Sequence, residues 1–154
     1  MREKLKWLLL IFFILLSLFI KSKINESKVK IPKEDEVSKI VFINVVNNRG
    51  IEKNTIYERK DIKKILNELK KSTRINKGSV HSTPKKDKFT LILFEMSDDG
   101  YIKNSIYKEA SNLYFYQPFY GIFKLDNDDI SLFLENENKE DISLDIEEIF
   151  NDEF

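Results

Sequence analysis

An uncharged stretch of 14 residues, Trp7 to Ile20, constrains this chain more than any other feature of its sequence. As a helix it would be about 21 Å long, which is shorter than the roughly 30 Å hydrocarbon core of a bilayer. Continued from Leu5 to Ile24, with lysines at both ends, it reaches about 20 residues and the length of a spanning helix. The sequence therefore predicts a membrane span bounded by Trp7 and Ile20.

The residues after this stretch distinguish a retained anchor from a cleaved signal peptide. They contain no small-residue cleavage pattern, and the chain has no cysteine that could carry a lipid. We therefore favour an uncleaved signal anchor over residues 1–24. A cleaved signal and a buried core helix are the two alternatives. The basic start indicates a single-pass protein of the cell membrane, with its N-terminus cytoplasmic, its domain extracytoplasmic and membrane lipid as a partner of the helix.

The rest of the chain divides by composition into three parts. Residues 25–36 form a predicted juxtamembrane linker, residues 37–135 a predicted domain, and residues 136–154 an acidic tail or weak amphipathic helix. The net charge of zero hides a strong asymmetry, because residues 126–154 carry one basic and 12 acidic side chains. Such a tail is typically solvated, or screens a basic part of the same molecule.

Periodicity predicts the elements of the domain. A β-branched run from Val37 to Val46 predicts a strand, and after an Asn-Asn-Arg-Gly turn Ile51 to Glu58 predicts a second. Apolar residues at i, i+3, i+4 and i+7 predict a helix over Asp61 to Lys71. The remaining elements are predicted as strands over 89–96, 101–108 and 113–117, an extended run over 122–125 and a short helix after residue 129.

This order predicts an α+β fold. An antiparallel sheet in the order ββ-α-βββ-α has a helix packed on one face and follows the N-terminal transmembrane helix.

The only histidine is His81, in a polar loop beside Ser79 and Ser82. A Ser–His pair suggests a hydrolase only as a remote alternative, because nothing in the sequence fixes the acid that would orient the base. With no second histidine, no cysteine and no cation-binding loop spacing, we expect no metal. We likewise expect no catalytic residue and no cofactor.

Two surfaces are candidates for ligand contact. Residues 60–88 carry ten basic side chains against three acidic ones, which predicts a basic patch that could meet an anionic polymer. The patch is centred on five of these residues: Lys63, Lys64, Lys70, Lys71 and Arg74.

The second candidate is an aromatic platform. Six of the eleven residues from Leu113 to Phe123 are aromatic. Strand alternation sends Leu113 and Phe115 to one face of the sheet and tyrosines to the other. A sheet covered on one face only would display those tyrosines to a sugar or a peptide. The predicted ligand-binding residues are Tyr114, Tyr116 and Tyr120. Packing of these rings in the core is the alternative.

Several short motifs resemble those of a known family. They are Ile31-Pro32, the strand motif SKIVFI, the helix motif DIKKILNEL, the loop TRINKGSVHSTP and the segment LYFYQPFYGIFKLD. Over roughly Ile31 to Glu135 the chain resembles a domain-of-unknown-function family of small membrane-anchored proteins and lipoproteins from low-GC Gram-positive bacteria. The resemblance implies a location at the membrane and the predicted fold, and it identifies no catalytic residue.

These observations favour a membrane-anchored, extracytoplasmic binding or sensing module that is not an enzyme. The alternative is an accessory or structural subunit of a membrane-protein complex. Besides lipid, the predicted partners are a membrane protein or an anionic wall polymer, and not nucleic acid.

Overall fold

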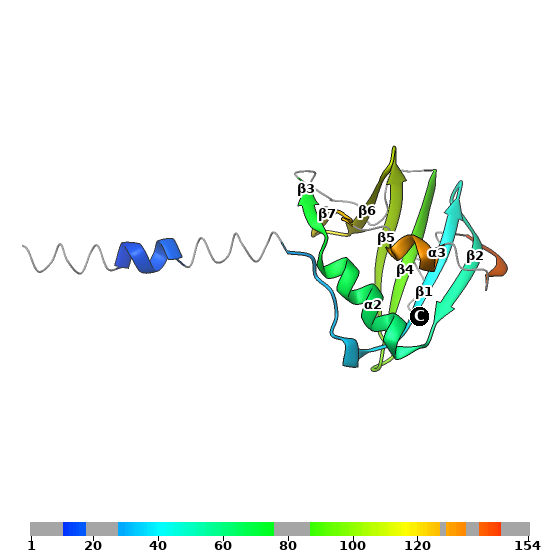
Figure 1. The fold of residues 1–154 in the computed structure, drawn as a ribbon, viewed down its shortest axis with the longest axis horizontal. Coiled ribbons are helices and arrows are strands. Elements are labelled where there is room, and N and C mark those ends of the chain that lie inside the picture. Colours follow the sequence, from blue (N-terminus) through cyan, green and yellow to red (C-terminus); the bar gives the residue numbers. More distant parts are fainter. Residues whose placement is uncertain (1–10, 18–27, 76–86, 127–128, 135–138, 146–154) are drawn as a thin grey trace, which may run out of the picture.

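A computed structural model describes residues 11–17, 28–75, 87–126, 129–134 and 139–145 of the protein. Residues 11–17 are helical. The domain that follows contains a short 3-10 helix, eight strands and two helices (Figure 1). In chain order they are η1 (Glu34–Glu36), β1 (Val37–Val46), β2 (Arg49–Ile56), α2 (Arg59–Lys70), β3 (Thr73–Ile75), β4 (Lys88–Met96), β5 (Tyr101–Glu109), β6 (Asn112–Gln117), β7 (Gly121–Lys124), α3 (Asp129–Leu134) and β8 (Glu140–Asp145).

All eight strands belong to one antiparallel sheet in the order β3-β7-β6-β5-β4-β1-β2-β8. Tight hairpins join β1 to β2, β4 to β5, β5 to β6 and β6 to β7. In the β1–β2 turn Asn47 and Asn48 have φ values of 50° and 65°, a conformation that asparagine tolerates well. Three pairs of neighbours lie far apart in sequence, namely β1 and β4, β3 and β7, and β2 and β8, and the first pair joins the two halves of the chain at the centre of the sheet.

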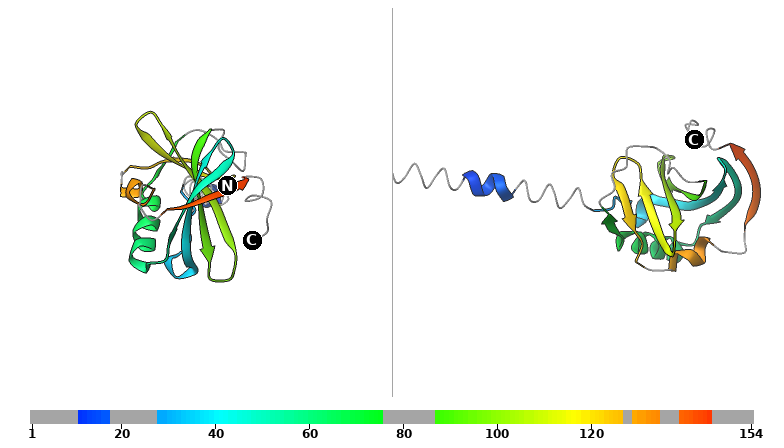
Figure 2. Two further views of the ribbon diagram at one scale, coloured as in Figure 1. Left: turned by 90° about the vertical axis from the view of Figure 1, so that its right-hand side faces the viewer. Right: turned by 90° about the horizontal axis from the view of Figure 1, so that it is seen from above.

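Helices α2 and α3 lie on the same face of the sheet (Figures 1 and 2). Helix α2 buries Ile62, Ile65, Leu66 and Leu69, the stripe that its 3.6-residue period predicts. These side chains pack on alternate residues of the central strands, among them Ile40, Phe42, Ile92, Phe94, Ile106 and Phe115. Burying each such side chain contributes roughly 1.5–3 kcal/mol, so this layer is the main core.

The opposite face of the sheet is also apolar. The intervening residues of the same strands form a second cluster of buried side chains: Val41, Ile43, Val45, Phe89, Leu91, Leu93, Tyr107 and Tyr116. At one side of the sheet β2 and β8 curl away from the helices (right panel of Figure 2). The central strands are therefore apolar on both faces, which explains why their sequences are nearly continuous hydrophobic runs.

The predicted fold class, ββ-α-βββ-α behind a transmembrane helix, is wrong. The sheet has eight strands, and two of them, β3 and β8, were not expected. Strand β3 is the polar tripeptide Thr73–Ile75, which pairs with β7. Strand β8 lies in the acidic tail, where we expected a weak helix or no structure, and it pairs with β2. Backbone pairing between segments far apart in the sequence creates both strands, and local periodicity does not report it.

The predicted location is also wrong. Within the part of the chain that the structure describes, no helix is long and apolar enough to cross a membrane. That finding overturns the single-pass membrane protein with an extracytoplasmic domain. The predicted bounds of the span, Trp7 and Ile20, lie outside the described residues.

Candidate functional site

A half-open cavity of about 560 Å³ lies at one end of the sheet. Its walls come from the ends of β1, β2, β4, β5 and β6 and from α3. In Figure 1 the β1–β2 and β5–β6 hairpins, which contribute to this end of the sheet, lie above α3. Its volume falls in the range of small-molecule sites, about 300–1,000 Å³. The apolar part of the described lining includes Val46, Ile51, Phe89, Ile106, Leu113 and Leu134.

Three polar side chains form a hydrogen-bonded row across the inner wall of the cavity. The Thr90 hydroxyl donates to Asn44 Oδ1 at 2.8 Å, and Asn44 Nδ2 donates to Glu52 Oε2 at 2.8 Å. Strand register explains the row, because Asn44 pairs with Thr90 on one side and with Glu52 on the other. Lys139 Nζ reaches the same Oε2 atom at 3.1 Å.

This row keeps the Glu52 carboxyl ionised. The hydrogen bond from Asn44, followed by that from Lys139, lowers the pKa of Glu52 below its usual value. Both contacts end on Oε2. Among the described residues no donor contacts Oε1. The inner wall therefore presents one carboxylate whose charge Lys139 already balances.

Two exposed lysines, Lys88 and Lys108, also line the cavity. The paired part of β4 and β5 ends at Thr90 and Ile106, and Lys88 and Lys108 each lie two residues beyond that pair on their strands. Neither lysine forms an ion pair with any residue that the structure describes. Glu52 is the only carboxylate in the described lining. Among the described residues, the mouth of the cavity therefore carries two basic side chains and no acidic partner for them.

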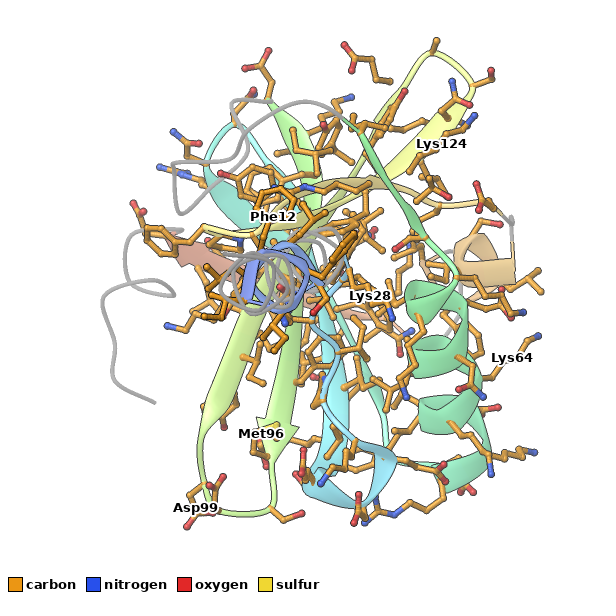
Figure 3. The ribbon with its side chains drawn as sticks, turned by 90° about the vertical axis from the view of Figure 1, so that its left-hand side faces the viewer. Phe12, Lys28, Lys64, Met96, Asp99 and Lys124 are labelled. Atoms are coloured by element: carbon orange, nitrogen blue, oxygen red, sulfur yellow. The ribbon has the colours of Figure 1, made fainter. Side chains whose placement is uncertain are left out.

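The opposite end of the same strands holds a second polar cluster. Glu95 Oε2 accepts from Lys39 Nζ at 2.7 Å and from the Tyr101 hydroxyl at 2.7 Å, and Ser38 Oγ lies 3.5 Å from Oε1. Met96 and Asp99 mark the β4–β5 hairpin at this end in Figure 3. Burial alone would raise the pKa of Glu95, but the hydrogen bonds from Lys39 and Tyr101 outweigh it and lower the pKa. The charge of Glu95 is therefore satisfied by contacts within the cluster itself.

The predicted tyrosines do not share one exposed surface. Alternation is as expected, since Phe115 packs in the core under the helices while Tyr114 and Tyr116 face the other way. Tyr116 is buried, and Tyr114 is half-buried and stacks on Tyr107 with ring centroids 5.4 Å apart. Tyr120 is exposed, in the β6–β7 turn. Ligand contact at these rings stays a prediction, and only Tyr120 offers an open ring.

The predicted basic residues are distributed between α2 and β3. Lys63 lies 3.6 Å from Glu34, and Lys71 lies 2.6 Å from Glu68. Lys64, which points away from the domain in Figure 3, has its Nζ 5.6 Å from the centre of the Phe133 ring. Lys70 is exposed at the end of α2, and Arg74 lies on β3, where it approaches Gly121. Acidic neighbours thus offset part of the predicted patch, and its role with an anionic polymer stays a prediction.

The remaining sequence-based site lies outside the described residues, since His81 belongs to 76–86. Within the described ranges no group of three or more His, Cys, Asp or Glu side chains could hold a metal ion. The cavity itself was missed, although one signal pointed to it. Asn44 and Thr90 are polar residues at positions that alternation assigns to the helix-covered face.

Comparison with known proteins identifies a family but no activity. No curated protein matches the chain significantly. The NMR structure of a protein from Ruminococcus gnavus is 25% identical, with a TM-score of 0.53. That match covers 65% of this chain and 93% of the other. A family model described as "Domain of unknown function (DUF5300)" matches residues 25–124, which is more than half of the chain. The chain therefore belongs to this uncharacterised family.

Proposed function

We propose that this protein is a non-enzymatic binding module and that the cavity beside α3 is its binding site. The observation that carries the proposal is the combination of a volume of about 560 Å³ with a mixed apolar and polar lining. Sites for small molecules combine a mainly apolar wall with a few fixed polar groups that orient the ligand. We also propose the Gram-positive source that the family resemblance implies, and the similarity to a protein from Ruminococcus gnavus supports that source.

The two kinds of lining have separate roles in this proposal. Ile106, Leu113 and Leu134 remove the apolar part of a ligand from water. Asn44 and Thr90 are held in place by their hydrogen bonds, so their positions are set before a ligand arrives. A ligand therefore meets a preformed site.

A neutral fluorescent probe tests whether the cavity accepts an apolar molecule. N-phenyl-1-naphthylamine brightens when it leaves water, and we expect it to brighten with the full chain. Leu134→Trp fills the cavity and should remove that part of the signal, whereas Leu132→Trp should not, because Leu132 is 63% exposed on the same helix and does not line the cavity.

The comparison between these two variants is the decisive one. The helical residues 11–17 expose large apolar side chains and will also bind the probe, but equally in all three proteins. After circular dichroism has shown that both variants fold, equal fluorescence of Leu134→Trp and Leu132→Trp would refute the proposal.

A second candidate function, an accessory subunit of a protein complex, is supported by the β6–β7 turn. Phe119 is 80% exposed and has a φ of 64°, an unusual conformation for a bulky residue. Tyr120 beside it is half-exposed. Exposed aromatic side chains commonly anchor protein partners. In vivo cross-linking tests this candidate, since a stoichiometric partner that Phe119→Ser abolishes would favour it over the cavity.

A further inference from the structure

We infer that the cavity selects an anionic amphiphile, a single molecule with an apolar body and a carboxylate or similar head group that Lys88 and Lys108 bind. This inference rests on the proposed binding function and adds the class of ligand. It follows from the charge of the mouth, the balance of charge at the inner wall and the position of the apolar lining.

The two lysines at the mouth of the cavity favour an anionic head group. Lys88 and Lys108 line one cavity from neighbouring antiparallel strands, and Val46 and Leu113 are their pairing partners on the outer sides. Neither outer partner carries a charge. Two like charges that line the same cavity repel each other, and an anion between them removes that repulsion. A bound head group would therefore stabilise the site as well as the complex.

The carboxylate at the inner wall of the cavity does not favour a cationic head group. Glu52 would attract a cationic head group if it were unpaired, but Lys139 lies 3.1 Å from it and Asn44 donates to the same oxygen. The lining lysines have no such partner among the described residues. The balance of charge in the cavity therefore favours an anion at the mouth.

The apolar lining of the cavity indicates that the ligand also has an apolar body. Ile106 is buried directly inward of Lys108 on β5, and Leu113 and Leu134 are half-buried beside it. A head group between the lysines would leave its apolar body in contact with these three side chains. Phosphate or another small inorganic anion would leave that surface exposed to water, which is why we specify an amphiphile.

Isothermal titration calorimetry with three eight-carbon probes tests the inference. Octanoate, octan-1-ol and octylamine share an alkyl chain and differ in the charge of the head group. Charge-assisted hydrogen bonds add about 1.5–3 kcal/mol, so we expect octanoate to bind about tenfold or more tightly than octan-1-ol. The Lys88→Gln/Lys108→Gln variant should bind octanoate only as well as octan-1-ol.

A matched double variant controls for overall charge. Lys60→Gln/Lys70→Gln removes two exposed lysines of α2, neither of which forms an ion pair within the described residues, and it should leave octanoate binding unchanged. Equal affinity for octanoate and octan-1-ol would overturn the inference, as would tightest binding of octylamine or an unaffected Lys88→Gln/Lys108→Gln variant. In each of these cases binding that Leu134→Trp abolishes would leave the proposed function standing. Absence of binding by all three probes would refute both proposals.

Discussion

Charged side chains lie at both ends of strands β1, β4 and β5, but within the part of the chain that the structure describes they form ion pairs at one end only. At the β4–β5 hairpin, Lys39 contacts Glu95, and Tyr101 and Ser38 complete the contacts of that carboxylate. At the other end, Lys88 and Lys108 line a cavity and have no acidic partner among the described residues. The same strands thus end in a self-contained cluster on one side and in an unbalanced site on the other. The comparison separates charges that stabilise the fold from charges available to a ligand.

The largest effect on stability should come from the self-contained cluster. Glu95→Gln removes the charge that Lys39 and Tyr101 contact, and we expect a loss of about 2 kcal/mol in the free energy of unfolding at neutral pH. Urea unfolding measures it. Glu58→Gln is the control, since Glu58 is exposed and makes no side-chain cap hydrogen bond. A loss no larger than that of the control would show that the cluster does not stabilise the fold.

The same cluster predicts a pH dependence. The pKa of Glu95 is lower in the folded protein than the usual value of about 4.3. Its stabilisation is therefore complete above the unfolded pKa and is lost as the pH falls through the folded pKa. The stability difference between wild type and Glu95→Gln should shrink between about pH 5 and pH 3. A difference that stays constant over this range would contradict the assigned direction of the shift.

An intermediate effect is expected at the inner wall of the cavity. Asn44→Ala removes the side chain that joins Thr90 to Glu52, and we expect a loss of about 1–2 kcal/mol. Asn67→Ala, at an exposed position of α2, is the matched control and should cost nothing, because alanine favours helix. Chemical denaturation of both variants compares them. Equal losses of stability in the two variants would mean that the hydrogen bonds of Asn44 do not stabilise the inner wall of the cavity.

The smallest effect should have the opposite sign. Lys108→Glu replaces one of the two like charges that line the cavity by an opposite charge, and we expect a gain of about 0.2–1 kcal/mol in stability. The same change should abolish octanoate binding. A thermal unfolding series that includes Lys70→Glu as control measures the gain. A loss of stability with Lys108→Glu would show that the two lysines do not repel each other.

How far the sequence predicted the fold depends on whether the signal is local. Strand β1 has the bounds that its β-branched run predicts, and α2 buries the stripe that its period predicts. Strands β3 and β8 carry no such signal. The acidic residues of β8 face largely outward at the edge of the sheet, so its sequence resembles that of a solvated tail.

The candidate site was missed for a related reason. Asn44, Glu52 and Thr90 come from three strands, and only their register brings them together. The tyrosine platform was expected because we assumed that one face of the sheet was covered. Instead the second face has its own apolar cluster, in which Tyr116 is buried. Whether a face is covered depends on the whole fold, and alternation within one strand cannot report it.

Mapping octanoate by NMR tests most directly the claim that the two ends differ in function. Backbone amide shifts of the full chain would be followed during a titration with octanoate. The account predicts that changes concentrate at residues 44–46, 88–90 and 106–113, with none at Lys39, Glu95 or Tyr101. Changes at the Glu95 cluster, or a titration that leaves the cavity residues unshifted, would contradict it.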